Sequence, residues 1–567
     1  MWGWSFIFNP MEITMKKSPI LWIAGRVRRR IPAILLMTAA QIVNALLAVF
    51  FALGTRGVID SAIAADPALF RIACLKQAGI IAGILLSATM LRYLRERLRA
   101  DLEWDWKQRL LHGLLHGDYE AVSAYHSGEL LNRLNNDVNR VNDGILSIVP
   151  NAAAMVTRLI AAVVVLGTLD GRFTLAVLGL GLVVLTATGL LRRRLKELNK
   201  QVSSQDGKVS GFLQETMEKL LMVQTMDVAG EVERRADVLL ADRYAVQRKR
   251  RTISLVSSTC IGIMSYGAGF LALCWCGWKL LQGRMSFGSL TAVTQLVGQL
   301  QAPFVNLSGV MPQYIAMLAS AERLMELEQI QGEPSPMEED PAELYKRMDA
   351  IRARKLNFAY DRDRVLSDAE FALPKGAFAV ITGPSGIGKS TILKLLLGVF
   401  HPESGELFLD CGEEKMALDR STRRLFAYVP QGNLLLSGTV LENLTIVRPE
   451  ASQEEIQQAI FVSAMDDFLP QLPQGLDTVL GENGTGLSEG QAQRLAIARA
   501  VLGGAPVLLL DECTSALDED TEKRVLERIR MLPNRTCIAV THRPAAMALC
   551  DWQMKVEAGS IRVCHRE

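Results

Sequence analysis

The residues with the clearest chemistry form a glycine-rich stretch, Gly383-Pro384-Ser385-Gly386-Ile387-Gly388-Lys389-Ser390-Thr391. Two glycines flank four residues and precede Lys and Ser, which is the spacing of a phosphate-binding loop. Glycines allow successive backbone N–H groups to face one phosphate, and a helix that begins there adds partial positive charge. Lys389 is placed to reach the β- and γ-phosphates of a nucleotide, and the Ser390 hydroxyl to hold Mg²⁺. The other loop residues predicted to contact the phosphates are Gly383, Ser385, Gly386, Gly388 and Thr391.

The segments on either side of this loop must hold it in place. Residues 377–381 form an apolar run that predicts a buried strand, and residues 392–397 have helical character. Gly398 stands where the C-terminal cap of that helix would be. This context separates a phosphate loop from an ordinary glycine-rich turn. From Ile351 onward apolar strands alternate with helical patterns, which predicts a parallel-sheet α/β domain.

A second reactive pair follows another apolar run, residues 507–510. Asp511 is placed to hold Mg²⁺ directly or through water, and Glu512 to orient and polarise an attacking water as general base. Two acids after a strand can also be a simple polar exit from the sheet. The phosphate loop upstream favours the chemical interpretation.

Between the two groups lies Leu487-Ser488-Glu489-Gly490-Gln491, followed by a helical stretch. Here the chain resembles the ATP-binding cassette (ABC) family, with eight features in the family's order. The resemblance implies that ATP is the nucleotide, that Tyr360 stacks on adenine, and that His542 contacts the γ-phosphate. It also implies that Gln431 senses Mg²⁺ and faces the membrane domain, and that Glu482 couples the two domains.

The resemblance implies a partner as well, because cassettes of this family bind head to tail. Each ATP then lies between the phosphate loop of one cassette and the signature helix of the other. The signature residues implied to contact ATP are Ser488, Gly490 and Gln491, and Asp518 lies in the loop that links the two sites. The family's usual Leu-Ser-Gly-Gly-Gln has Glu489 at its first glycine here, and a carboxylate near a triphosphate costs electrostatic energy unless it points outward. This departure slightly favours a heterodimer over a homodimer.

Length and composition limit the class of protein. A chain of 567 residues is too long for one core, so we expect two or three domains. The formal net charge of +2, without a basic domain, argues against a nucleic-acid partner. The nine cysteines show no paired metal-type spacing and several lie in apolar runs, so we expect no disulfide framework.

Six apolar runs before residue 322 are expected to cross a membrane, after a short interfacial helix that carries Trp22 and Arg26. Basic ends alternate with turns of little positive charge, so the positive-inside rule places both chain termini in the cytoplasm. Two long polar connections keep helical spacing, which predicts helices that extend into the cytosol and reverse near residues 125–129 and 210–215. The predicted spans are residues 31–53, 78–91, 145–169, 173–191, 253–278 and 285–321.

These observations predict a multidomain chain: an all-α six-helix transmembrane domain (residues 1–325), a linker (326–349) and an α/β P-loop ATPase domain (350–567). The first half is similar to the membrane domain of type IV exporters, which implies a half-transporter of the plasma or inner membrane. It would bind ATP and Mg²⁺, and it would pair with a second half-transporter in the lipid bilayer. The dimer would export a peptide, drug-like or other amphipathic compound. A lipid or glycolipid flippase is the alternative, and a non-transporting regulatory ABC ATPase is a third interpretation that the intact Glu512 and His542 disfavour.

Polar residues in the membrane runs suit a substrate cavity. Arg158 is the only charged residue in the central part of an apolar run, and it is expected to face protein or water rather than lipid. The alternative is that Arg158 only joins neighbouring helices. The other candidate cavity residues are Gln295, Gln299, Gln301, Asn306, Trp275 and Trp278.

Overall fold

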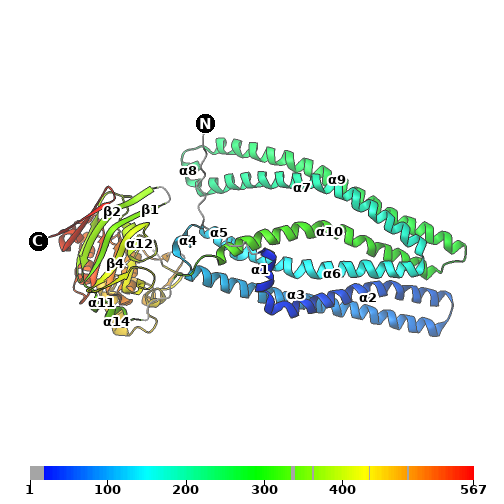
Figure 1. Cartoon of the computed structure of the whole chain (residues 1–567), viewed down its shortest axis with the longest axis horizontal. Coiled ribbons are helices and arrows are strands. Elements are labelled where there is room, and N and C mark those ends of the chain that lie inside the picture. The colour runs from blue at the N-terminus through cyan, green and yellow to red at the C-terminus, as the bar shows by residue number, and fades with distance from the viewer. Residues whose placement is uncertain (1–17, 334–338, 361–362, 433–434, 482–483, 567) are drawn as a thin grey trace. The chain divides into compact units, whose positions relative to one another are not determined.

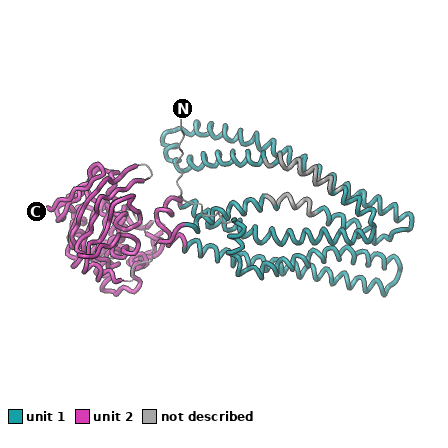
Figure 2. The backbone as a smooth tube through the Cα atoms, viewed as in Figure 1, with its two compact units in different colours: residues 1–112, 127–329 teal, residues 113–126, 330–567 magenta. Residues whose placement is uncertain are grey.

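The computed structural model describes residues 18–333, 339–360, 363–432, 435–481 and 484–566, without the side chains of 180, 182–193, 196, 261, 302–309 and 311 (Figure 1). The chain divides into two compact units (Figure 2). Unit 1 comprises the described parts of residues 1–112 and 127–329, and unit 2 those of residues 113–126 and 330–567.

Unit 1 consists of helices, and two of the long ones begin at a capping residue. The Asp170 carboxylate accepts the Phe173 N–H at 3.3 Å and begins one helix, and the Ser286 hydroxyl accepts the Ser289 N–H at 3.1 Å and begins another. The elements are α1 (Pro19–Arg26), η1 (Arg28–Arg30), α2 (Ile31–Ile63), α3 (Pro67–His116), α5 (Ser127–Asn132), the π-helix η2 (Arg133–Asp137), α6 (Val138–Leu169), α7 (Gly171–Glu218), α8 (Leu220–Thr225), α9 (Ala229–Leu281) and α10 (Phe287–Glu328).

Four helical segments are long and apolar enough to cross a membrane, by length and composition, within the described part of the chain. They are Arg28–Ile63, Pro67–His116, Ser127–Leu169 and Ala229–Leu281. The helices α7 and α10 are also long, at 48 and 42 residues, but some of their side chains are not among those that the structure describes. The number of six spans therefore stays a prediction.

Helices α7 and α9 lie side by side as an antiparallel pair, joined through the short helix α8 (Figure 1). The second reversal of the chain falls at α8, so residues 210–215 lie inside α7, slightly before the turn that the sequence pattern indicated. The first reversal falls at the short helix α4 (Tyr119–Ser123).

An ionic cluster around the buried side chains of Asp137 and Arg133 joins α10 to the π-helix before α6. Asp137 is fully buried and accepts two hydrogen bonds from the Arg323 guanidinium, at 2.7 and 2.6 Å. The Ser320 hydroxyl donates to the same carboxylate at 2.8 Å. Arg133, also buried, donates to the Arg323 carbonyl at 2.9 Å and pairs with Glu129 at 2.7 Å. The helices are thus joined here by charge as well as by apolar packing, in a place where a π-bulge interrupts regular helix geometry.

Unit 2 contains a six-stranded sheet in the order β12-β11-β3-β10-β9-β6 and a four-stranded antiparallel sheet in the order β2-β1-β4-β5. Strands β3, β10, β9 and β6 are parallel, and Val540 of β10 is aligned with Ile381 of β3 and Asp511 of β9. Their carboxyl ends therefore meet at one edge. The strands are β1 (Ala350–Tyr360), β2 (Asp363–Pro374), β3 (Phe378–Thr382), β4 (Ser404–Cys411), β5 (Glu414–Ala417), β6 (Phe426–Val429), β7 (Gly438–Thr439), β8 (Val479–Leu480), β9 (Val507–Asp511), β10 (Thr536–Val540), β11 (Trp552–Glu557) and β12 (Ser560–His565).

Two apolar cores lie on the two sides of the parallel strands. Helices such as α14 and α15 cover one side, and the antiparallel sheet together with α12 covers the other. Leu344, Tyr345 and Met348, in and just after α11, are buried in one of these cores, although they lie in the predicted linker. The helices are α4, α11 (Pro341–Arg347), η3 (Arg423–Leu425), α12 (Lys389–Leu396), α13 (Val440–Thr445), α14 (Gln453–Val462), η4 (Met465–Asp467), η5 (Leu469–Gln471), η6 (Gly475–Asp477), α15 (Glu489–Leu502), α16 (Glu519–Arg530) and α17 (Pro544–Leu549).

The segment around α4 belongs to unit 2 and is bonded to it. The Asp118 N–H donates to the Gln331 carbonyl and the Glu333 N–H to the His116 carbonyl, both at 3.0 Å. The Tyr119 ring packs edge-on against Phe400, with ring centroids 6.0 Å apart. A piece of the first long connection is thereby part of the α/β unit.

Candidate functional site

The predicted phosphate loop leaves β3 and enters α12, as the flanking sequence indicated. Its glycines have backbone angles that favour glycine, with φ of +153° at Gly383, +79° at Gly386 and +102° at Gly388. A Cβ on Gly388 would lie 2.1 Å from the Val365 Cγ1, and one on Gly383 would lie 2.8 Å from the Val556 carbonyl oxygen. Both positions therefore require glycine for space as well as for conformation.

This difference between the glycines gives a matched pair of variants. We expect Gly388→Ala to lower nucleotide affinity sharply, because it adds a clash with Val365 to backbone strain. Gly386→Ala adds only the strain, about 1 kcal/mol, because nothing lies within 4 Å of its added Cβ. Equilibrium binding of ATP to the full-length chain measures both. Equal losses in the two variants would contradict the role given to the Val365 contact.

The carboxyl ends of the parallel strands bring distant motifs to the loop. The Ser390 hydroxyl donates to the Asp511 carboxylate at 2.9 Å. The Lys389 ammonium lies 2.9 Å from the His542 Nε2 and donates to the Gly383 carbonyl at 2.7 Å. Residues that are up to 153 positions apart in the sequence thus share one site at the edge of the sheet.

Glu512 stands beside this group in an unusual backbone conformation. Its φ is +48°, in the left-handed region, and its N–H donates to the Val540 carbonyl at 2.9 Å. The Gln431 amide, which follows β6, donates to the Glu512 carboxylate at 2.8 Å. A non-glycine residue held at positive φ costs of order 1 kcal/mol, and such strain concentrates at functional sites.

Asp511 is the most deeply buried acid of the site, at 2% exposure. Burial raises the pKa of its carboxyl above the ordinary value and outweighs the lowering effect of the Ser390 and Tyr428 hydrogen bonds. The Tyr428 hydroxyl donates to the other carboxylate oxygen at 3.1 Å. Burial and the Asp511 charge raise the pKa of Tyr428, so that its hydroxyl keeps its proton.

We expect Asp511→Asn to make the protein more stable while it abolishes ATP hydrolysis. Because the folded-state pKa is raised, the carboxyl's stabilising contribution is fully present below the unfolded-state pKa, and it is lost as pH rises through the folded-state pKa. An amide is neutral at every pH and can still bond to both hydroxyls. Thermal melting at pH 7 without nucleotide should therefore shift upward, by about 2–4 °C per kcal/mol. The exposed Asp520→Asn should show no such gain, and a lower melting temperature for Asp511→Asn would contradict the argument.

Tyr360 ends β1 and is held by aromatic neighbours. Its ring contacts Phe358 and Phe400 edge-on, with centroids 4.9 and 5.4 Å away, and its hydroxyl lies 3.3 Å from the Thr391 hydroxyl. The residue remains 40% exposed, so the ring is accessible to a ligand. An accessible aromatic ring is the group that stacking on adenine would need.

The signature residues form a regular helix start. The Ser488 hydroxyl accepts the Gln491 N–H at 3.3 Å, and the Gln491 side chain accepts the Ser488 N–H at 2.8 Å, which makes a capping box. A Cβ on Gly490 would meet the Ala516 carbonyl oxygen at 2.9 Å. Glu489 is the exposed first residue of the helix. Asp518 caps α16 by accepting the Thr521 N–H at 2.9 Å.

Three residues support this site without having been singled out by the sequence analysis. Gln493, 5% exposed, donates to the Ser515 hydroxyl and accepts the Ala516 N–H, both at 3.1 Å. Arg543 donates to the Leu517 carbonyl at 2.9 Å. These two residues connect the signature helix, the 515–518 loop and the segment that carries His542. Tyr428 is the third supporting residue. Of the three, only Gln493 left a signal in the sequence, because it is a polar residue on the apolar side of a helix.

The donor atoms fit Mg²⁺ when phosphate oxygens complete its shell. The Ser390 hydroxyl and the Asp511 carboxylate supply hard oxygen ligands side by side. No group of three His, Cys, Asp or Glu side chains able to hold a metal occurs among the described residues, so the protein offers no complete cage there. Mg²⁺ is commonly bound in this way, by one or two protein oxygens plus substrate phosphates.

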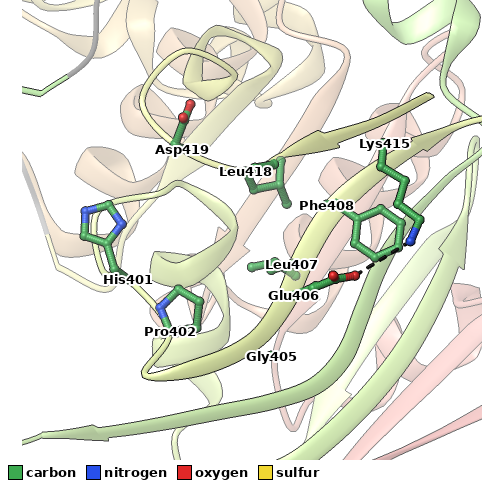
Figure 3. A pocket seen from close by; sticks show the side chains of 10 residues that line it. His401, Pro402, Gly405, Glu406, Leu407, Phe408, Lys415, Leu418 and Asp419 are labelled. Atoms are coloured by element: carbon green, nitrogen blue, oxygen red, sulfur yellow. Dashed lines mark ion pairs between the residues drawn. The ribbon is translucent and has the colours of Figure 1, made fainter.

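A separate cavity of about 420 Å³ lies against the antiparallel sheet (Figure 3). His401, Phe408 and Asp419 line it, and Glu406 pairs with Lys415 across 3.7 Å at its side. None of the residues predicted to bind nucleotide lines this cavity. It is therefore distinct from the site at the end of the parallel strands.

The predicted cavity residues in unit 1 partly serve to join helices. The Gln299 amide donates to the Ala48 carbonyl at 2.7 Å, and the Gln301 amide to the Ser265 carbonyl at 3.0 Å. The Trp275 indole donates to Asp170 at 2.8 Å. The Arg158 Nε is buried without a hydrogen-bond partner among the described residues. Glu482 and the side chain of Asn306 lie outside the described residues.

Comparison with known proteins shows which families the two parts of the chain match. Residues 33–304 match the family model of the ABC transporter transmembrane region, and residues 366–515 match the ABC transporter model. An uncharacterized ABC transporter ATP-binding protein, y4gM of Sinorhizobium fredii, is 28% identical over 467 residues, which are 80% of this chain and 78% of that protein. The cyclolysin secretion/processing ATP-binding protein CyaB of Bordetella pertussis is 29% identical over 452 residues, 79% of this chain and 60% of CyaB.

A solved structure shares the whole fold. It is a bacterial Atm1-family ABC exporter with ATP bound, which aligns with a TM-score of 0.76 at 24% identity and covers 94% of both chains. The predicted fold class, a helical transmembrane domain followed by an α/β ATPase domain, is confirmed. One membrane region fused to one cassette implies a dimer in a membrane. The chain belongs to the ABC transporter family, as an ATP-binding, ATPase-coupled transporter with an exporter fold.

Proposed function

We propose that this chain is one half of a dimeric exporter of the plasma or inner membrane, with both termini in the cytoplasm. It uses Mg²⁺ and ATP hydrolysis to move a peptide, drug-like or other amphipathic compound by alternating access. The observation that carries the proposal is the meeting of Lys389, Asp511 and His542 at one edge of the parallel sheet. The secretion named for the Bordetella relative supports the outward direction of transport.

Each side chain of the site has a role in this proposal. The loop N–H groups and Lys389 hold the phosphates, and Tyr360 stacks on adenine. Mg²⁺, held by Ser390, Asp511 and Gln431, would neutralise charge on the phosphate oxygens. Glu512 accepts the proton of the attacking water, and His542 contacts the γ-phosphate. The Gln431 bond keeps the Glu512 carboxylate oriented toward the site.

The second half of the ATP site comes from the partner cassette. The N-terminus of α15 presents Ser488, the Gly490 N–H and Gln491, and the loop that ends at Asp518 packs against Gly490 through the Ala516 carbonyl. A helix N-terminus favours an anion, so the γ-phosphate can bridge the two subunits. That bridge is lost on hydrolysis, which supplies the two states that transport requires.

Glu489 makes the pairing a testable question. Its carboxylate would stand near the partner's triphosphate, so we infer a slight preference for a heterodimer with two unequal sites. The chain purified alone should hydrolyse ATP weakly, and Glu489→Gly should raise that activity, because the change removes a like charge. ATPase activity and particle mass measured on the same sample provide the check. A stable homodimer with robust activity, unchanged by Glu489→Gly, would reverse the inference.

A transport experiment separates the exporter from its alternatives. Inside-out vesicles that contain the chain, with its partner if one is needed, should accumulate an amphipathic compound only with ATP. Vesicles with Glu512→Gln serve as the control and should accumulate none. ATP-dependent movement of a headgroup-labelled lipid alone would favour the flippase, and ATPase activity without either movement would favour a regulatory ATPase.

A further inference from the structure

Helices α7 and α9 form the antiparallel pair of unit 1 (Figure 1). Residues of both helices line a basic pocket. Its volume is about 540 Å³. Three cations and one carboxylate line it, together with an amide, a hydroxyl and two aliphatic side chains. The lining residues are Arg194, Arg248, Lys249, Glu197, Gln201, Thr252, Leu198 and Ile253.

The cations of this pocket are free to bind an anion. Arg194, Arg248 and Lys249 are exposed, and none takes part in an ion pair with another described residue. Farther along the same two helices Arg243 is instead paired with Asp206. Glu197 is the single acid of the lining, so the pocket keeps a net positive charge of two.

The position of the pocket along the helices indicates the source of the anion. Arg194 lies three residues after the predicted span 173–191 of α7, and Thr252 lies directly before the apolar run of α9. The pocket is thus at the level where these two predicted membrane spans end, on the side that the charge bias assigns to the cytoplasm. Half-buried Leu198 and Ile253 add aliphatic surface beside the cations.

We propose that this pocket binds the phosphate group of an anionic phospholipid of the cytoplasmic leaflet. Basic pockets between spanning helices bind anionic headgroups, because several cations meet one phosphate near the membrane surface. The aliphatic pair favours a lipid, whose glycerol region it can contact, over free phosphate. The inference rests on the membrane location of the chain and not on what the chain transports.

The test measures lipid binding to the full-length chain by native mass spectrometry in detergent. Wild type should retain phosphatidylglycerol more tightly than phosphatidylcholine. The triple variant Arg194→Gln/Arg248→Gln/Lys249→Gln should bind phosphatidylglycerol on the order of 10²-fold more weakly, about fivefold for each cation. Glu197→Gln should bind it about fivefold more tightly, a gain that damage to the fold would not produce.

A matched control removes the same charge from the same two helices outside the pocket. The triple Lys208→Gln/Arg234→Gln/Arg235→Gln takes one cation from α7 and two from α9 and should bind as wild type does. Equal weakening by both triples, or equal binding of the two lipids, would overturn the proposal. Binding of inorganic phosphate that excludes phosphatidylglycerol would overturn the lipid assignment. ATPase activity of the same samples reports separately on the proposed function.

Discussion

Glu512→Gln should lower ATP turnover by roughly 10²-fold or more, the effect expected from the loss of a general base. ATP binding should remain, because Lys389 and Ser390 are unchanged. The glutamine is nearly the same shape, and its carbonyl oxygen can still accept the Gln431 amide bond that now reaches Glu512. Turnover and equilibrium ATP binding of the full-length protein measure the two effects separately.

The matched control is Glu519→Gln, which removes the same charge from an exposed acid at the start of α16. It should leave turnover within a factor of about two, as expected for a surface substitution. Activity near the wild-type level in Glu512→Gln would remove this residue from the chemistry. A loss of binding as large as the loss of turnover would mean that the substitution disturbs the loop instead.

Arg323→Met should destabilise the transmembrane unit by about 2–3 kcal/mol, less than the cost of breaking a fully buried ion pair, because Arg323 is itself 37% exposed. Asp137 is fully buried, and Arg323 supplies two of its three hydrogen bonds. The remaining Ser320 hydroxyl carries no charge, and Arg140, 3.9 Å away and 60% exposed, replaces only part of the lost attraction. Thermal melting of the detergent-solubilised protein should therefore occur at a clearly lower temperature.

Two further variants separate this buried pair from surface electrostatics. Arg140 lies 3.9 Å from the same carboxylate but is 60% exposed, so Arg140→Met should cost less than about 1 kcal/mol. Adding Asp137→Asn to Arg323→Met should restore most of the lost stability, since no charge then stays buried. If the double variant melts as low as Arg323→Met, the loss comes from packing rather than from charge.

The parts of the site that depend on neighbouring residues were predictable from the sequence. The strand, loop and helix around Lys389 are encoded within about twenty residues, by an apolar run, glycines with special angles and a helix start. Glu512 and Asp511 were found because an unbroken apolar strand ends at them. The resemblance to ABC proteins added Tyr360, Gln431 and His542, whose spacing alone carries no such information.

The parts that depend on tertiary contacts were not predictable. Gln493 and Arg543 act by bonding to a loop that lies beside them only after the sheet has formed. Tyr428 bonds to Asp511 because β6 and β9 are neighbours, and that order is a property of the topology. The long connection after the second predicted span likewise looked like one polar segment, although residues 113–126 join the α/β unit and the rest does not.

The burial of α11 decides where the chain can be cut. Leu344, Tyr345 and Met348 are at most 3% exposed, and the Tyr345 hydroxyl lies 2.9 Å from the Thr536 hydroxyl of β10. A recombinant fragment that began at residue 350, where the first strand starts, would open a hole in its own core and lose that bond. A protease that cleaves ahead of Pro341, and not next to the first strand, would leave α11 in the released fragment and keep this core closed.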